Sequence, residues 1–417
     1  MIKMNRPIRV LFALNDASGG ASMSAYQLMK NLSPTKVEPF AVCYPSGSDV
    51  DYNRFERVCT DIQKIYMPWC TIPLDEPHYM QWIIWAKRMG HSLFHLIPIA
   101  RLSALIRKWD IDIVHSNTCT QWDAAFAAQL MGIPHVWHLR EFIGPGLPFR
   151  YGIPTQALGH IFSKFSNQLV SNSSVAAANV GLEKSQKMTI LPNPVELDAF
   201  DSDTARERGQ ELRRSLGIAE HEILIGKCAA IGASWKRHDL FIRAAAELKD
   251  YPGLRFCIFG TLPESGKAGW AYYQKLCRMV QDAGLGRKFC FAGYIPDIPG
   301  MMNALDILCH TSPHESFGRI VIEAMAAAKP VVGFQSGGVG ENILHGKTGF
   351  LAQPESYRQI ANFLKQLVGN PSLCRKFGRM GKVIAEKGYS MVNYSAQMES
   401  IYHQLMNSNP EERGRRL

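Results

Sequence analysis

The stretch that decides the fold is HESFGRIVIEAM, residues 314–325. It follows the apolar run DILCHTS and predicts the end of a strand, a loop, and a helix that begins near Phe317 or Gly318. The amino end of a helix carries unpaired backbone N–H groups and a partial positive charge, and a glycine lets an anion approach them closely. The stretch therefore predicts a phosphate site at the start of this helix.

Two carboxylates flank this helix start. Glu323 lies beyond Gly318 by roughly 7 to 8 Å at about 1.5 Å per helical residue, which is about the span from a diphosphate to the ribose of a nucleotide. A carboxylate there accepts hydrogen bonds from a vicinal diol. Glu315, before the helix, is placed to do the same for a second sugar. The alternative is that both acids face solvent, but the apolar neighbours of Glu323 in RIVIEAMAA argue against its exposure.

Short apolar runs alternate with helix-like stretches on either side of this segment. They include IRVLFAL, IDIVHSN and HVWHLRE in the first half, and EILIGKCAAI, RFCIFG and KPVVGF in the second. The alternation predicts an α/β fold of two Rossmann-like units, each a parallel sheet with helices on both faces. We expect residues 1–200 to form the first unit and 201–388 the second, with the polar stretch DSDTARERGQELRR at the junction. Residues 389–417 are expected to form a helix that crosses back to the first unit.

Length and composition fit a folded enzyme-sized protein. The 417 residues, 46% hydrophobic and 20% charged, suit two domains of roughly 150 to 200 residues. The apolar runs are shorter than the roughly 20 residues of a spanning helix, and the N-terminus runs into a strand pattern instead of a signal peptide, so we expect a cytoplasmic protein. The ten cysteines form no C-x-x-C pair, which favours reduced, buried thiols over disulfides or zinc.

The net charge of +10 suits phosphorylated substrates, an anionic membrane surface or nucleic acid. Nucleic acid is the weakest of the three, because no RNA-reading or helix-turn-helix signature appears and the basic residues are spread along the chain. Residues 81–109 are rich in Trp, Leu, Ile, Lys and Arg. They predict either a basic amphipathic helix lying on the inner face of a membrane or a helix pair packed on the first sheet, and both interpretations stay open.

The segment ESFGRIVIEAMAAAKPVV resembles the E-x7-E signature of retaining nucleotide-sugar glycosyltransferases of the GT-B fold, often called group 1 or family 4. The similarity extends to PHVWHLRE, LPNPVELDAF, SGGVGENILHGKTGFL and the tripeptide at 235–237. The resemblance implies two Rossmann-like domains facing each other across a cleft. The first would bind the acceptor and the second the nucleotide-sugar donor.

The resemblance also implies roles for the residues around the helix start. Glu315 would contact hydroxyl groups of the donor sugar and take part in catalysis, and Glu323 would bind the ribose of the nucleotide. Ser316, Phe317 and Gly318 would complete the donor site, the last two through their backbone amides.

In this family the diphosphate is held by a basic pair, an Arg a few residues before a Lys. Lys236 matches the Lys and follows the run EILIGKCAAI, whereas Ile231 stands at the expected Arg position. We expect Lys236 to bind the diphosphate and stabilise the leaving group, and Arg237 or Arg319 to compensate for the missing charge. The alternative is that Lys236 and Arg237 form a solvated helix start.

Four residues of the first half complete the predicted site. The resemblance places His138, at the end of HVWHLRE, near the transferred sugar as a catalytic residue, and a satisfied core histidine is the alternative. His115 in DIVHSN is balanced evenly between the same two interpretations. Gly19 and Gly20 follow the first strand and would let backbone amides approach the donor, unless they form a plain turn. They are not part of a G-x-G-x-x-G sequence, which argues against an NAD-dependent enzyme.

These features predict the transfer of a sugar from a nucleoside-diphosphate donor to a hydroxyl acceptor, and the resemblance implies retention and a place in polysaccharide or glycolipid synthesis. The resemblance also implies that the departing phosphate takes the proton of the acceptor, so no covalent nucleophile is needed. We expect no cofactor and no metal requirement. The alternatives are a sugar-nucleotide epimerase or hydrolase of the same fold, and a sugar-nucleotide-binding protein that has lost catalysis.

Overall fold

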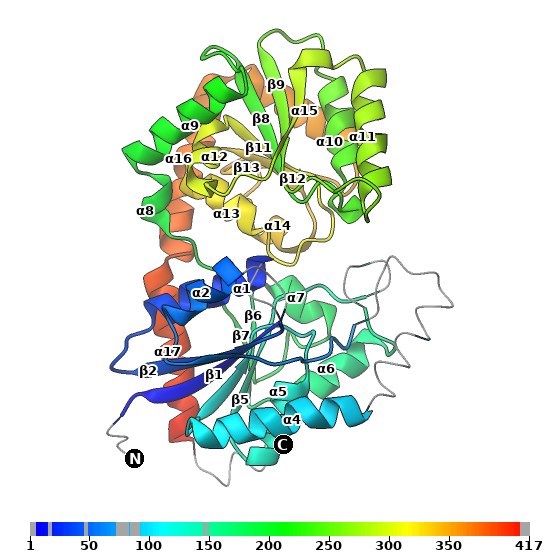
Figure 1. Ribbon diagram of the computed structural model, residues 1–417. Coiled ribbons are helices and arrows are strands. Elements are labelled where there is room, and N and C mark those ends of the chain that lie inside the picture. Colours follow the sequence, from blue (N-terminus) through cyan, green and yellow to red (C-terminus); the bar gives the residue numbers. More distant parts are fainter. Residues whose placement is uncertain are drawn as a thin grey trace. The chain divides into compact units, whose positions relative to one another are not determined.

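The computed structural model describes residues 6–15, 19–45, 49–71, 83, 92–144, 147 and 150–408. The chain divides into two compact units, Met1–Pro194 together with Met391–Leu417, and Val195–Ser390 (Figure 1). Each unit carries a parallel sheet flanked by helices, so the predicted α/β fold of two Rossmann-like units is confirmed. The units meet in sequence at Pro194, a few residues before the expected position 200.

The first unit is built on a parallel sheet with the strand order β3-β2-β1-β4-β5-β6-β7. In the described residues its strands are β1 Ile8–Leu14, β2 Val37–Cys43, β3 Ile62–Lys64, β4 Ile113–Ser116, β5 His135–Leu139, β6 Gln168–Ser171 and β7 Met188–Ile190. Its helices are α1 Gly19–Asn31, α2 Asp49–Glu56, α4 Ser92–Lys108, α5 Asp123–Met131, α6 Thr155–Lys164, α7 Ser174–Asn179 and α17 Met391–Asn407.

Alternate residues of β1 face two different apolar cores. Val10 and Phe12 pack in a cluster with residues of α1 and α17. Leu11 and Ala13 point the other way, into a cluster with residues of α4 and α5. Helices therefore cover both faces of this sheet (Figure 1), as parallel strands that are apolar on both sides require.

The second unit is built on a parallel sheet with the order β10-β9-β8-β11-β12-β13. Its strands are β8 Ile223–Cys228, β9 Leu254–Phe259, β10 Phe289–Gly293, β11 Ile307–His310, β12 Val331–Phe334 and β13 Gly349–Ala352. Its helices are α8 Leu197–Phe200, α9 Asp203–Ser215, α10 His238–Ala246, α11 Trp270–Asp282, α12 Ile298–Ala304, α13 Arg319–Ala326, α14 Gly337–Asn342, α15 Tyr357–Val368 and α16 Pro371–Gly388, with 3-10 turns η1 Ser234–Lys236 and η2 Gly286–Lys288.

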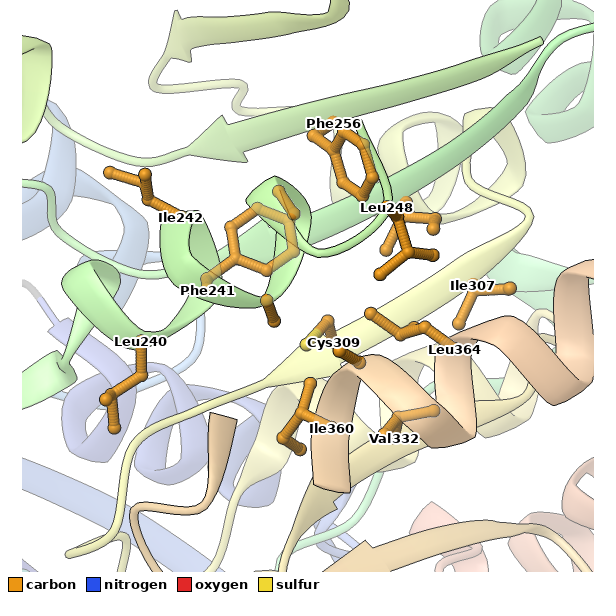
Figure 2. Packing of buried hydrophobic residues seen from close by; sticks show 14 of the residues in the cluster. Leu240, Phe241, Ile242, Leu248, Phe256, Ile307, Cys309, Val332, Ile360 and Leu364 are labelled. Carbon is orange, nitrogen blue, oxygen red and sulfur yellow. The ribbon is translucent and has the colours of Figure 1, made fainter. Parts of the chain in front are cut away.

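One core of the second unit fills the space between the sheet and helices α10 and α15 (Figure 2). Phe241 of α10 and Leu364 of α15 meet Cys309 and Val332 of the sheet there. The opposite face of the sheet carries a second cluster, in which α12 and α13 supply most of the helical side chains and α8, α14 and α16 contribute others. The buried faces of α10 and α13 thus fix where these two helices begin relative to the strands that precede them.

The chain order of the second sheet places its ligand edge. The strands run outward from β8 through β9 to β10, and the chain then returns to β11 on the other side of β8 before continuing to β12 and β13. In such sheets ligands bind beyond the carboxyl ends of the strands at the point where the order reverses. The loops that follow β8 and β11 are therefore the expected place for a site, and they contain Lys236 and Glu315.

The polar stretch expected at the junction forms α9, inside the second unit. Ala205 and Gly209, one helical turn apart, are its buried residues. A Cβ added at Gly209 would lie 2.8 Å from the backbone nitrogen of Ala304, so α9 packs closely on α12. The stretch carries too few apolar side chains to be noticed as an amphipathic helix, because small residues form the buried face.

Two global expectations concern the cysteines and the membrane. None of the ten cysteines forms a disulfide, in agreement with the expected thiols. Among the described residues, every helix is too short or too polar to cross a bilayer.

Candidate donor site in the second unit

Helix α13 begins at Arg319, and Gly318 is its N-cap in the left-handed conformation, with φ 79° and ψ 53°. The expected helix start near Phe317 or Gly318 is thus confirmed. A Cβ at position 318 would lie 2.8 Å from Cγ2 of Val339 and strain the backbone as well, so glycine is required there. The side chain of Phe317 is buried against the ring of Tyr389. Phe317 therefore has only its backbone to offer a ligand.

Helix α14 holds the loop before α13 in place. The N–H of Gly338 donates a hydrogen bond of 2.9 Å to the backbone oxygen of Glu315. The side-chain amide of Asn342 donates one of 2.6 Å to the backbone oxygen of Phe317, and the hydroxyl of Tyr389 donates in turn to Asn342. The backbone that leads into the helix is therefore fixed through its carbonyl groups.

Glu315 and Lys236 form an ion pair at this helix start, with 2.7 Å between Nζ and Oε2. Both side chains are about a quarter exposed. The loops that carry them are joined, because Ser312 donates a hydrogen bond to the backbone oxygen of Lys236 and Thr311 donates one to that of the next residue. The structure thus brings together these two predicted residues, which are far apart in sequence.

The charge of Glu315 is maintained by its neighbours. Burial raises the pKa of this carboxyl, but Lys236 and then His310, whose Nε2 lies 3.8 Å from Oε2 of Glu315, hold the pKa below its usual value. Burial lowers the pKa of His310 itself to about 3, so this histidine is neutral at physiological pH. The site presents a carboxylate and an ammonium group, as the recognition of hydroxyl groups and phosphate requires.

Glu323 lies on the buried face of α13 and is 6% exposed. Its Oε1 accepts a 2.8 Å hydrogen bond from Nε of Arg319, one helical turn earlier. Burial raises the pKa of Glu323, and the guanidinium of Arg319 opposes this shift. The alternative in which Glu323 faces solvent is therefore wrong.

Both arginines expected to compensate for Ile231 are already paired with carboxylates. Arg237 donates to Asp239 and also pairs with Glu355, and Arg319 is taken up by Glu323. Ile231 itself is fully buried, in the same apolar cluster as Phe241 and Cys309. The position expected to hold an arginine thus contributes only to packing.

Sequence reasoning missed Lys227, which lies near the carboxyl end of β8 and is 1% exposed. Burial lowers its pKa to about 8. The signal was present in the sequence, since a lysine interrupts the otherwise apolar run ILIGKC of a strand that the alternation predicts to be buried on both faces.

In the first unit, His138 is the residue before the last of β5 and is fully buried. Its ring stacks on that of His115 with 5.5 Å between centroids, and its Nδ1 lies 3.2 Å from a guanidinium nitrogen of Arg140. The Nδ1 of His115 bonds to the hydroxyl of Tyr402 at 2.6 Å. The Nε2 atoms of both histidines are buried without a hydrogen-bond partner among the described residues.

Burial, and then the charge of Arg140, lower the pKa of both histidines, so both rings are neutral. Arg140 was also missed by sequence reasoning. It is 5% exposed and donates hydrogen bonds to Asn117 and Tyr394. The catalytic role of His138 stays a prediction.

Gly19 and Gly20 lie at the exposed start of α1, as expected for residues after the first strand. Gly19 has φ +81°, a conformation that favours glycine, and a Cβ at either position would meet no atom of the described residues within 4 Å. The backbone conformation accounts for Gly19. The contact of Gly19 and Gly20 with the donor stays a prediction.

Of the predicted membrane segment, residues 81–82 and 84–91 lie outside the described residues. Helix α4 covers most of the remainder. It packs against the first sheet through its own residues Leu102, Leu105 and Ile106. Leu96 and Ile97, at the other end of α4, are 59% and 60% exposed. Packing on the sheet is thus the correct interpretation for the second half of α4.

Comparison with known proteins identifies the family. The family description "Glycosyltransferase Family 4" matches residues 18–199, and "Glycosyl transferases group 1" matches residues 209–383. The chain is 29% identical over 206 residues to 2-deoxystreptamine glucosyltransferase of Streptomyces kanamyceticus, a match to 48% of this chain and 50% of that protein. It is also 29% identical over 221 residues to D-inositol 3-phosphate glycosyltransferase of Corynebacterium jeikeium, or 52% and 51% of the two chains. The matched region thus spans about half the length of these curated relatives.

Solved structures extend the similarity over nearly the whole fold. Anabaena HepE in complex with UDP has a TM-score of 0.76 at 20% identity and covers 95% of this chain and 100% of its own. A glycosyltransferase of Rickettsia africae has a TM-score of 0.77 at 18% identity and covers 97% of this chain and 100% of its own. Together with the two family matches, the fold shows that this chain belongs to the group 1 glycosyltransferases of the GT-B fold.

Proposed function

We propose that the protein transfers a sugar from a nucleoside-diphosphate donor to a hydroxyl group of an acceptor, with retention of the anomeric configuration. The observation that carries the proposal is the Glu315–Lys236 pair at the amino end of α13, with Glu323 buried one to two turns further on. HepE, which shares this fold, has been solved with UDP and with UDP-glucose, and this supports a nucleotide-sugar donor.

In the proposed mechanism each group of the second unit has a separate task. The amides at the start of α13 and the ammonium of Lys236 hold the diphosphate and stabilise the negative charge that develops on it as the glycosidic bond breaks. Glu323 accepts hydrogen bonds from the ribose, and Glu315 accepts them from hydroxyl groups of the sugar.

The acceptor hydroxyl, bound by the first unit, attacks from the side of the leaving phosphate. That phosphate takes the proton, so no covalent enzyme intermediate forms. His138 is proposed to contact the transferred sugar as a neutral ring. No metal ion is assigned a role.

The test begins with binding. A thermal-shift panel of uridine, guanosine and adenosine diphosphate sugars is expected to stabilise the wild-type protein selectively, because a ligand that binds only the folded state raises the melting temperature by mass action. Glu315→Gln and Glu323→Gln should lose most of this stabilisation. Glu264→Gln, at a 72% exposed carboxylate, is the matched control and should keep it.

Product analysis separates this proposal from its alternatives. With the selected donor and a panel of sugar and lipid-linked acceptors, NMR should find a new glycosidic bond of the same configuration as the donor. An inverted product overturns retention, and free sugar or an isomerised donor identifies a hydrolase or an epimerase. Binding without turnover over the whole panel supports the protein that has lost catalysis, an alternative that Ile231 favours.

We further propose that the acceptor belongs to polysaccharide or glycolipid synthesis and that the protein works in the cytoplasm, attached peripherally to the inner face of the membrane. The exposed Leu96 and Ile97 of α4 and the net charge of +10 support this attachment. Liposome flotation at low salt checks it. Failure to bind anionic vesicles contradicts it, and vesicles of neutral lipid are the control.

A further inference from the structure

Lys227 is a buried cation to which the proposed mechanism gives no task. It is 1% exposed on β8, and its partner in the neighbouring strand β9 is Ile258. On the other side of β8, Leu308 of β11 pairs with Gly226, and Cys309 follows Leu308 in the chain. The apolar cluster that is drawn in part in Figure 2 contains both Ile258 and Cys309. Among the described residues, the ammonium of Lys227 has no hydrogen bond and no ion pair.

The ammonium group lies within electrostatic reach of the donor site. It interacts with Lys236, in the turn that follows β8, and with Glu315, in the loop that follows β11. Both loops extend from the carboxyl ends of neighbouring strands, and Lys227 is the residue of β8 before the last. The lysine thus lies near the carboxyl end of β8, at the edge of the sheet where the order of the strands reverses.

An unpaired ammonium in such a place costs free energy, because burial removes its water and no protein group replaces it. The other cations of this edge are each neutralised by a carboxylate: Lys236 by Glu315, Arg319 by Glu323, and Arg237 by Asp239 and Glu355. Lys227 differs from these three in having a charge that is not balanced before a ligand arrives. A strained buried charge beside a binding site is typical of a functional group.

We propose that Lys227 binds the diphosphate of the donor as the cation whose counterion is the ligand itself. The inference rests on the proposed function, because it assigns a further residue to the same donor site. It makes the protein less stable when empty and favours the nucleotide that restores neutrality. Replacing the lysine by a residue of similar length without charge should therefore stabilise the empty protein and weaken nucleotide binding together.

The inference also predicts a pH dependence of binding. Burial lowers the pKa of Lys227 to about 8, and a bound anion favours the charged form. The affinity should thus be constant below about pH 8 and fall by up to about tenfold per pH unit above it, as expected for uptake of one proton. The titratable groups that face Lys227 are Cys309, Cys228, Glu315, Lys236, His310 and His238.

Most of these neighbours titrate well away from pH 8. Burial raises the pKa of Cys309 to about 12 and lowers that of both His310 and His238 to about 3. Burial raises the pKa of Cys228, and Lys236, His310 and Lys227 together lower that of Glu315 despite its burial. A transition near pH 8 therefore reports on Lys227.

The experiment measures the dissociation constants of uridine, guanosine and adenosine diphosphates by calorimetry from pH 7 to 9.5, with the corresponding nucleosides as controls. At pH 7, Lys227→Met is expected to weaken diphosphate binding about 10- to 100-fold, as for a lost charged contact. The same variant should raise the melting temperature of the empty protein by a few degrees. Lys227→Arg should keep the affinity and lose the transition near pH 8, because its guanidinium stays charged.

Lys329→Met is the matched control. It removes another largely buried lysine of the second unit, whose pKa burial lowers, but one that precedes β12 at the amino edge of the sheet. It should leave diphosphate binding unchanged. Should Lys227→Met fail to fold, the pH profiles of the wild-type protein and of Lys227→Arg decide the question.

The outcomes distinguish the inference from the function on which it rests. If the wild-type protein binds a diphosphate but Lys227→Met binds it equally well, or if wild-type binding is flat from pH 7 to 9.5, the role of Lys227 is overturned and the donor site stands. If no diphosphate binds the wild-type protein at any pH, the proposed function is wrong, and the role inferred for Lys227 is wrong as well.

Discussion

At the scale of single residues, the Glu315–Lys236 pair determines how the charge of the donor site responds to pH. Burial raises the pKa of Glu315, and Lys236, His310 and Lys227 together more than cancel this effect. A carboxyl whose folded pKa is depressed adds stability above its unfolded pKa of about 4.3, and this stability is lost as the pH falls through the folded pKa. Lys236 is the largest of the charges that oppose burial, so its removal should raise the pKa of Glu315.

We therefore expect Lys236→Met to lower the free energy of unfolding by an amount that grows with pH. The difference from the wild-type protein should be small at pH 3.5 and reach about 1 to 3 kcal/mol at pH 6.5, where Glu315 is left charged without its partner. Urea unfolding over this range measures it. In a Glu315→Gln background the same substitution should show no such growth, and a difference independent of pH in the wild-type background would contradict the coupling.

Glu323 leads to a prediction about the ribose. Burial already raises its pKa, so replacing the carboxylate by an amide removes a charge that the fold holds at a cost. We expect Glu323→Gln to keep the melting temperature within a few degrees. The wild-type protein should bind uridine diphosphate about tenfold more tightly than the 2′,3′-dideoxy analogue, as expected for the loss of charge-assisted hydrogen bonds.

Glu323→Gln should abolish most of this preference for the intact ribose. Calorimetry with both ligands measures the ratio, and Glu264→Gln serves as the exposed control. If Glu323→Gln weakened the binding of both ligands equally, Glu323 would be a structural residue of α13 instead of a ribose ligand.

The acids at 315 and 323 could be predicted from their spacing and apolar context, which are local properties, whereas the lysine at 236 was indicated by the resemblance. It did not predict that Lys236 and Glu315 pair with each other, since that contact depends on β8 and β11 being neighbours in the sheet. It also did not predict that Arg237 and Arg319 are neutralised by Asp239, Glu355 and Glu323. The partners of a charged side chain are decided by tertiary packing, which residue type and spacing do not encode.

At the scale of elements, the site depends on how closely α14 approaches the loop before α13. Gly338 is the point of contact, because a Cβ there would collide with the backbone oxygen of Ser316 and lie 2.5 Å from the Cα of Phe317. A Cβ at Gly340, two residues later in the same helix, would be in ordinary van der Waals contact, with the backbone carbon of Gln335 as its nearest neighbour at 3.6 Å. The two glycines thus form a matched pair.

We expect Gly338→Ala to push the loop away from α14 and to misplace the amides at the start of α13. It should lower the free energy of unfolding by about 1 to 3 kcal/mol, as overpacking does, and weaken uridine diphosphate binding. Gly340→Ala should leave binding unchanged and stabilise the helix by up to about 1 kcal/mol. Urea unfolding and calorimetry test both, and equal effects of the two substitutions would rule out α14 as the support of the loop.

The element scale also shows where sequence patterns are sufficient. The start of α13 could be predicted because a glycine at the helix start and a run of apolar residues are both local signals. Helix α9 escaped notice because its buried face consists of Ala205 and Gly209, which carry little hydrophobic signal. Close packing of backbones is encoded by small residues, and these are as common in loops as in tight contacts.

At the scale of the whole molecule, the chain ends by returning to the first unit. Met391, Tyr394, Met398 and Tyr402 of α17 are buried in the cluster that they share with β1 and α1. Glu399, 5% exposed, accepts a 2.7 Å hydrogen bond from the N–H of Ser33 and pairs with Lys36. The helical spacing of the apolar residues near the C-terminus predicted the helix, and its return to the first unit was expected as well.

A chain that ends after Ser390 should therefore unfold differently in its two units. Removal of α17 exposes the cluster around Phe12 and leaves His115 without its bond to Tyr402, whereas Val195–Ser390 keeps all its elements. We expect hydrogen exchange to become fast in β1, β2 and β4 and to stay slow in β8 and β11. Uridine diphosphate should still protect the loop before α13 in the shortened protein, because Lys236, Glu323 and the amides at the start of α13, which are proposed to bind the diphosphate and ribose, lie in the second unit.

The control is a chain that ends after Ser408, which should match the full-length protein in both units. Tyr402→Phe is a milder change, since it removes only the hydrogen bond to His115. It should lower the free energy of unfolding of the first unit by about 1 to 3 kcal/mol, because a polar atom of His115 is left buried without a partner. Equal loss of protection in both units after truncation would show that the second unit depends on α17 for its stability. Slow exchange in β1 despite the truncation would show that the helix is dispensable to the first sheet.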